Sequence, residues 1–215
     1  MHRRRTLWLR VLGAVGVVAL AVVAVVLLLG GGGGSLLPGG DEGPSGFEFE
    51  LATAKASPTT DSTPADLQSE ADAAAAAVKS TMDHYYFSAF VDRDAWGDYT
   101  DAYALLDDAA AAKAETDADV VTLGTTASDR YGSIADPRGT LHVLVLTNEH
   151  DHAVSAIARV TFRLDAELTD GGANQVTSTG SFFLRPGEDG WVIYAYRVDR
   201  NERPAPSPSP TGSPT

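Results

Sequence analysis

A run of nineteen residues near the N-terminus, Val11–Leu29, contains no charged or hydrogen-bonding side chain. The hydrocarbon core of a bilayer offers no water to the backbone, so a segment inside it must satisfy its N–H and C=O groups within a helix. A helix rises 1.5 Å per residue, and about twenty residues cross the roughly 30 Å core. The run therefore predicts a single transmembrane helix, and the membrane is the first partner expected of this chain.

The charges on either side of this run predict its orientation. Residues 1–10 contain four arginines and no acid, and Trp8 lies where the membrane–water interface is expected. Because basic segments are retained in the cytoplasm, residues 1–10 are expected inside and the rest of the chain outside the cell membrane. A cleaved signal peptide is the competing interpretation. Its apolar region is usually shorter and ends at a small-residue cleavage site, whereas a run of glycines follows here.

The composition restricts the partners and the compartment of the chain. Asp and Glu total 29 and Lys and Arg total 16, which gives a formal net charge of −13. Such a surface repels nucleic acid, so no nucleic-acid partner is expected. The chain contains no cysteine, and its exported part must therefore be stable without disulfides.

The chain divides into segments of different composition. Residues 30–62 are rich in Gly, Pro, Ser and Thr and predict a flexible linker, and residues 204–215 predict a disordered Pro/Ser/Thr tail. Between them, residues 63–203 are sufficient for one domain with its own core. Phe47–Leu51 alternates with period two inside the linker. It is either a strand that docks on the edge of the domain or an unpaired apolar patch, and five residues do not decide between the two.

The first half of this domain has helical periodicity. Thr63 is a suitable N-cap and Pro64 fits the first helical position, so a helix is expected from there to about Val91. Its apolar side recurs every three or four residues. The stripe consists of Leu67, Ala71, Ala74, Val78, Met82, Tyr85 and Ala89.

The region between this helix and the first clear strand has weaker patterns. A second helical segment is expected from Asp94 through the alanines at 109–112, weakened at Gly97. Val120–Leu123 suggests a short strand, and Ser133–Gly139 suggests a loop.

The second half of the domain alternates with the period of a strand. Thr140–Thr147 is rich in β-branched residues, and Val154–Leu168 alternates strictly between apolar and polar side chains. Fifteen residues are long for a strand, so a bend or bulge is expected within it. Gln175–Arg185 and Trp191–Val198 follow with a Pro-Gly turn between them, and Gly180 predicts a bulge or curl. The expected fold is α+β, with helices packed on a strongly curved antiparallel sheet.

A helix pair followed by such a meander resembles the NTF2-like cone fold. The closing pattern is Gly190-Trp191-Val192-Ile193 followed by Tyr196–Arg200, and the resemblance covers about Thr63–Arg203. Behind a single N-terminal anchor, the chain is similar to actinobacterial Mce-associated membrane proteins. The resemblance implies accessory or assembly work in a cell-envelope complex with an envelope protein partner. No catalytic motif of the superfamily is matched residue by residue.

One pentapeptide has the residue types of a metal site. Asn148-Glu149-His150-Asp151-His152 places two imidazoles on one side of an extended chain, with carboxylates nearby. A metal site needs at least three well-placed ligands, and this peptide is better explained as the polar tip of a hairpin. No metal, no cofactor and no catalytic residue is assigned from the sequence.

A cone-fold enzyme or ligand-binding protein would place polar and aromatic groups in a pocket inside the sheet. The candidates for such a pocket are His84, Tyr85, Tyr86, Trp96 and His142. Catalysis would require His84 or His142 to converge with Asp or Tyr on one cavity.

The sequence is therefore compatible with three functions. The first is a non-catalytic interaction or assembly module, which predicts a filled interior together with an exposed apolar patch or open sheet edge. The alternative is binding of a small apolar ligand or lipid in a cavity of the cone. An enzyme is the third and has the least support.

Overall fold

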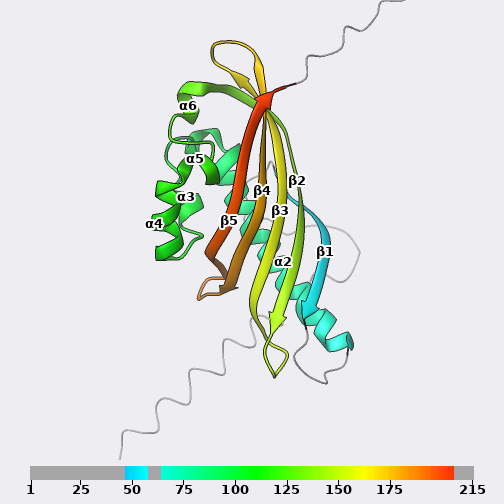
Figure 1. Cartoon of the computed structure of the whole chain (residues 1–215). Coiled ribbons are helices and arrows are strands. Elements are labelled where there is room, and N and C mark those ends of the chain that lie inside the picture. Colours follow the sequence, from blue (N-terminus) through cyan, green and yellow to red (C-terminus); the bar gives the residue numbers. More distant parts are fainter. Residues whose placement is uncertain (1–46, 58–63, 206–215) are drawn as a thin grey trace, which may run out of the picture. The chain divides into compact units, whose positions relative to one another are not determined.

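The computed structural model describes residues 47–57 and 64–205, and within them it shows an α+β domain (Figure 1). Five strands form one sheet, and the helices lie between the first and second strands in the chain. The elements in order are β1 (Glu50–Ser57), α2 (Pro64–Tyr86), a π-helical turn (Phe87–Val91), a 3-10 turn (Arg93–Ala95), α3 (Thr100–Tyr103), α4 (Asp108–Thr116), α5 (Ala118–Val121), α6 (Ala127–Arg130), β2 (Tyr131–Thr147), β3 (Ala153–Leu168), β4 (Ala173–Pro186) and β5 (Trp191–Pro204).

The predicted transmembrane helix, Val11–Leu29, lies outside the described residues, as do residues 1–10 and most of the predicted linker and tail. Among the helices of residues 47–57 and 64–205, none combines the length and apolar character needed to cross a membrane.

The sheet has the order β1-β2-β3-β4-β5 and is mixed rather than wholly antiparallel. The predicted antiparallel meander is confirmed for β2 to β5. The first strand differs, because β1 pairs with β2 in parallel. Two parallel neighbours need a long crossover, and the helical stretch from α2 to α6 provides one. The Phe47–Leu51 segment thus docks, with Phe47 and Phe49 buried and the pairing to β2 beginning at Glu50.

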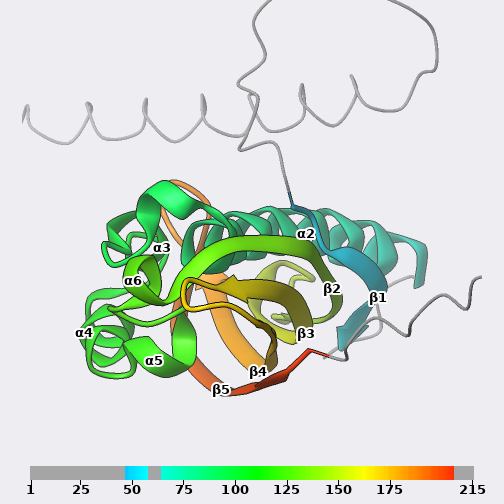
Figure 2. The ribbon, with the colours of Figure 1, turned by 90° about the horizontal axis from the view of Figure 1, so that it is seen from above.

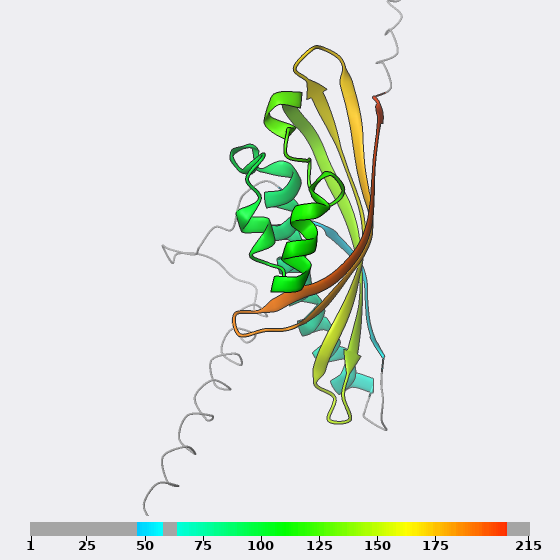
Figure 3. The ribbon, with the colours of Figure 1, turned by 60° about the vertical axis from the view of Figure 1, so that its left-hand side comes forward.

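Bulges give the sheet its strong curvature (Figure 3). The β2–β3 register shifts between Tyr131 and Ser133 and again between Ala135 and Arg138, where β2 carries the extra residues. Bulges of this kind increase the local twist of a strand pair. The predicted loop Ser133–Gly139 is therefore wrong, because this irregular stretch is the bulged first half of β2.

Of the two features predicted at Gly180, a bulge or a curl, the bulge is not found. The registers of β4 with β3 and with β5 run through it without a shift. A Cβ at this position would lie 2.3 Å from the carbonyl oxygen of Arg197 and 2.7 Å from the Cα of Val198. The glycine permits the close approach of the β5 backbone as the sheet curls.

The core lies between α2 and one face of the sheet, which is called the inner face below (Figure 2). All seven residues of the predicted helical stripe are buried, which confirms the face of α2 that contacts the sheet. The predicted alternation of β3 is also confirmed, because every second residue from Ala156 to Ala166 is buried. The opposite, outer face of the sheet carries the other half of each strand.

The predicted second helix is broken into short pieces. Gly97 adopts φ +89° between the 3-10 turn and α3, a backbone conformation that interrupts a helix. Farther on, Asp107 accepts a hydrogen bond from Ala110 N at 3.0 Å and caps α4. The predicted short strand at Val120–Leu123 is wrong, because Ala118–Val121 forms α5. Of these short helices, α4 and α5 pack beside β5, whereas α3 packs against α2 (Figure 1).

Candidate functional site

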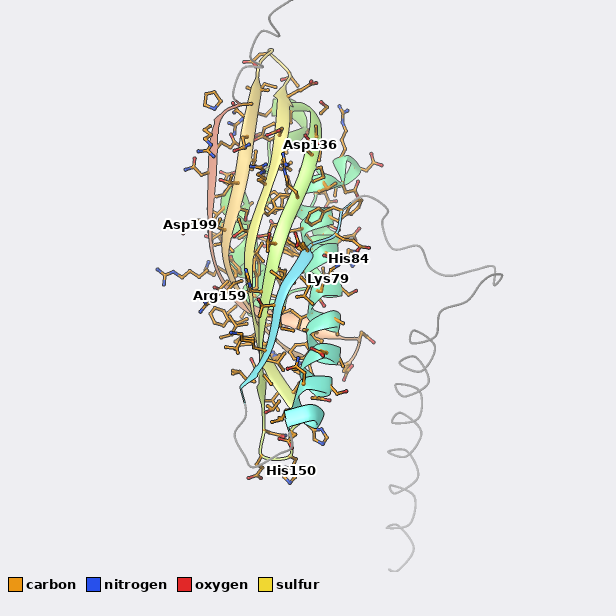
Figure 4. The ribbon with its side chains drawn as sticks, turned by 90° about the vertical axis from the view of Figure 1, so that its right-hand side faces the viewer. Lys79, His84, Asp136, His150, Arg159 and Asp199 are labelled. Carbon is orange, nitrogen blue, oxygen red and sulfur yellow. The ribbon has the colours of Figure 1, made fainter. Side chains whose placement is uncertain are left out.

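The five residues predicted to line an interior pocket lie in three environments. Tyr85 and Tyr86 are fully buried in the core, and Trp96 is 7% exposed at its margin. His84 is exposed on the helix side (Figure 4), whereas His142 is exposed on the outer face of β2. Catalysis at these positions required either histidine to meet an Asp or Tyr in one cavity. Both histidines are exposed, and the hollow that His142 lines contains no Asp or Tyr among the described residues.

The space between α2 and the inner face is occupied by aromatic side chains. Ring centroids lie 4.9 Å apart for Tyr86 and Phe162, 5.1 Å for Tyr86 and Phe90, and 5.1 Å for Phe47 and Phe162. The Tyr86 hydroxyl is 3.0 Å from the Ser178 hydroxyl, and burial raises the pKa of Tyr86 well above its usual value. These contacts fix the rings, so the inner face is used for packing.

The pentapeptide Asn148–His152 forms the tip of the β2–β3 hairpin (Figure 4). The Asn148 side chain accepts hydrogen bonds from the backbone N–H groups of His150 and His152, at 2.9 and 3.1 Å. This is turn chemistry, in which the amide organises the loop. Within residues 47–57 and 64–205, no group of three or more His, Asp or Glu side chains is placed to hold a metal ion.

The outer face of the sheet carries an apolar band across four strands, formed by Leu144, Ile157, Phe183 and Tyr194. Leu144 of β2 is paired with Ile157 of β3, and Ile157 with Phe183 of β4. On β5, the ring of Tyr194 lies 6.3 Å from that of Phe183, and Tyr194 is 37% exposed. Contiguous apolar side chains on an exposed sheet face are a feature of interaction surfaces.

Cations flank this outer apolar band. Lys55 is the β1 neighbour of Leu144, and the next row runs from His142 through Arg159 to Ser181 and Arg197. Lys55, Arg159 and Arg197 are exposed, and none of the three forms an ion pair with another described residue.

A shallow groove of about 360 Å³ lies where the outer apolar band meets these cations. Its lining is Thr53, Lys55, His142, Val143, Leu144, Ile157 and Arg159. The His142 Nδ1 atom is 3.2 Å from the Thr53 hydroxyl, which joins the edge strand β1 to β2 across the floor of the groove. The lining contains cationic and apolar groups and no carboxylate.

The opposite side of the domain has the opposite charge. Residues 64–130, which form the helices, contain 14 Asp and Glu but only 4 Lys and Arg. Lys79 and His84 mark this side in Figure 4, while Arg159 lies on the strand side. The domain is therefore polarised, with an acidic helical layer and a cationic, apolar patch on the outer face.

Lys55, Leu144, Ile157 and Arg159 were not singled out from the sequence. The sequence contained only a weak indication of this band. Ile157 and Arg159 lie on the polar side of the β3 alternation, and a single apolar residue on a polar side is common. Pairing across strands collects such single residues into a band. Their assembly depends on the β1–β2 and β2–β3 registers, which periodicity alone does not determine.

Comparison of the whole chain with known protein families, with curated proteins and with solved structures found no match.

Proposed function

We propose that this chain is a non-catalytic interaction or assembly module of a bacterial cell-envelope complex. Val11–Leu29 anchors it in the cell membrane as a single pass, residues 1–10 remain in the cytoplasm, and the domain works outside. The observation that carries the proposal is the outer face of the sheet, where half-buried apolar side chains and the exposed Tyr194 lie beside cations that have no described ion-pair partner.

The chemistry of the outer face defines its partner. The apolar band gains free energy when it is removed from water, at about 25 cal/mol per Å² of apolar surface. Lys55 and Arg159 at its margin favour a partner with carboxylates around an apolar centre. The acidic helical layer repels the same partner, so the charge distribution selects one face of the domain for docking. The partner we propose is an envelope protein with an acidic, apolar surface.

Membrane attachment suits this role. A tethered domain meets a partner in the same membrane at a raised effective concentration, which compensates for a modest contact area. The fold is consistent with an NTF2-like cone, because a helix lies across the inner face of a curved meander. On this interpretation the chain is similar to actinobacterial Mce-associated proteins, and the resemblance supports an accessory role by analogy only.

The alternative, a lipid or small apolar ligand inside the cone, has less support. Such a ligand needs an apolar cavity of several hundred Å³. Aromatic rings occupy the place where such a ligand would lie. They belong to Phe49, Tyr86, Phe162 and Phe182, each of which is at most 2% exposed.

Site-specific photo-crosslinking in the native membrane tests the proposal. A photoreactive amino acid at Ile157 of the full chain is expected to capture one defined protein, and the same group at the exposed Thr116 on α4 serves as the matched control. Arg159→Glu is expected to reduce the Ile157 product several-fold, because one like-charge contact opposes docking. Docking through the outer face would be contradicted if Ile157 and Thr116 gave the same crosslinked product. It would also be contradicted if Arg159→Glu left the yield of the Ile157 product unchanged.

A further inference from the structure

A second hollow lies at the other side of the sheet, where β5 passes beside α5 and α6. It has a volume of about 360 Å³. Its lining residues are Asp119, Leu123, Thr126, Arg130, Arg200 and Glu202. Unlike the outer groove, it has charges of both signs and a wall of helices, and it plays no part in the proposed docking face.

Arg200 is the central residue of this hollow. Its side chain is only 8% exposed, although it carries a full charge. The guanidinium donates to the Asp119 carbonyl oxygen at 2.8 Å, to the Tyr131 hydroxyl at 2.9 Å and to the Glu202 carboxylate. Its Nε–H is buried and has no acceptor among the described residues. A buried donor without an acceptor costs about 1–3 kcal/mol, so such a group needs an explanation.

Several donors of this cluster share one acceptor. Arg130, Arg200 and the Tyr131 hydroxyl all donate to the one carboxylate of Glu202. The Trp96 indole, whose ring lies 6.3 Å from that of Tyr131, also has a buried N–H without a described acceptor. Burial and the hydrogen bond to Glu202 raise the pKa of Tyr131 to about 12, so this hydroxyl remains a donor at neutral pH. Arg200 is thus the residue that both lines the hollow and has a donor without an acceptor.

The charges around the hollow restrict the class of this acceptor. Two guanidinium groups favour an anion, and guanidinium groups match the oxygens of a carboxylate or a phosphate. A doubly charged phosphate would meet the Glu202 and Asp119 carboxylates at close range, which opposes it. A singly charged carboxylate avoids much of this repulsion. A hydroxyl or amino group next to it could donate to Asp119, which is exposed at the rim.

We propose that this hollow is a binding site for a small carboxylic acid that carries a hydroxyl or amino group beside its carboxylate. The carboxylate is held by Arg130 and Arg200 with the Thr126 hydroxyl, and the neighbouring donor faces Asp119. Leu123 supplies the one apolar contact of the lining, which fits a ligand of a few carbon atoms.

Titration of the ¹⁵N-labelled full chain in detergent micelles tests this site. The chemical shifts of the Trp96 indole N–H and the Arg200 Nε–H report binding. The probes are L-alanine and L-lactate, the acid without the second donor is propionate, and the competing anion is inorganic phosphate. We expect saturable shifts of both reporters with alanine or lactate, and weaker binding of propionate and phosphate.

Two variants test whether the acid binds in this hollow. Arg130→Gln is expected to raise the dissociation constant about tenfold, the loss of roughly one charged hydrogen bond. This arginine is half-exposed, so its replacement leaves the fold intact. Arg159→Gln on the outer face is the matched control and should bind as wild type. The site would be overturned if the shifts did not saturate or were no larger than those caused by sodium chloride. Normal binding by the Arg130→Gln variant would overturn it as well. Tighter binding of phosphate than of both probes would overturn the ligand class.

Discussion

Individual tyrosines tie the helical layer to the rest of the domain. The Tyr85 hydroxyl on α2 donates to the Val121 carbonyl oxygen at 2.9 Å, and the Tyr99 hydroxyl donates to the Gly124 carbonyl oxygen at 2.8 Å. Each phenol places its ring in the core and gives its one donor to a backbone carbonyl in α5 or just after it. This use of tyrosine stabilises short helices that would not be stable alone.

Burial of these phenols predicts a loss of stability at alkaline pH. Desolvation, with smaller contributions from Tyr99 and Tyr196, raises the pKa of Tyr103 to about 12, whereas a tyrosine in the unfolded chain titrates near 10. The unfolded chain therefore loses this proton first, and stability falls as the pH rises from about 10 to about 12.

The variant Tyr103→Phe tests this linkage. Between about pH 9 and about pH 11, its urea midpoint should fall less than that of wild type. Because Tyr103 is half-exposed, the difference should be a fraction of the roughly 1.4 kcal/mol per pH unit that a full proton would give. Parallel pH profiles for the two proteins would show that Tyr103 does not titrate as described.

At the level of elements, the long regular patterns were predictable and the irregular ones were not. The fifteen-residue alternation of β3 and the stripe of α2 each repeat often enough for one face to be identified, and both faces were confirmed. Val120 and Val121 were misassigned because two β-branched residues carry little information about the backbone, which here forms a helical turn through Val121 N–H to Asp117 O and Thr122 N–H to Ala118 O. Ser133–Gly139 was misassigned because Gly, Pro and Asp are typical both of loops and of a bulged strand.

The candidate site was less predictable than the fold. The five residues proposed for an interior pocket share polar or aromatic chemistry, but that chemistry does not indicate which face of an element they occupy. The outer apolar band is assembled from single residues of separate strands, beside a parallel strand β1 that the sequence left undecided. Only the register brings these residues together.

The docking of β1 predicts a specific steric requirement on β2. A Cβ at Gly139 would lie 2.3 Å from a ring atom of Phe49 and 3.2 Å from the Thr161 carbonyl oxygen. Gly139→Ala should therefore displace the Phe49 ring and cost about 1–3 kcal/mol of unfolding free energy, measured by urea denaturation. Gly132→Ala on the same strand is the control, because its Cβ would have its nearest neighbour at 3.9 Å. Equal effects of the two variants would show that Phe49 is not packed on Gly139.

At the level of the whole molecule, the two sides of the domain differ in chemistry. The inner face is filled by aromatic packing, the helical layer is acidic, and the outer face combines apolar and cationic groups. The proposed membrane tether and the proposed docking surface together meet the needs of an assembly module. The proposed acid-binding hollow lies apart from that surface, so the two proposals can fail independently.

In the proposed arrangement the domain lies outside the membrane and a partner covers its outer face. Because the chain contains no cysteine, single cysteines at His142 on the outer face and at Asp101 on the helical layer are free of background labelling. Both positions are exposed in the domain. The measurement is the rate of labelling by a membrane-impermeant maleimide, in intact cells and in the purified full chain.

We predict that Asp101→Cys reacts at similar rates in both settings, whereas His142→Cys reacts at least several-fold more slowly in cells than when purified. Equal slowing at the two positions, or none at either, would contradict docking through the outer face. Failure of both cysteines to react until the cells are opened would contradict the extracytoplasmic location.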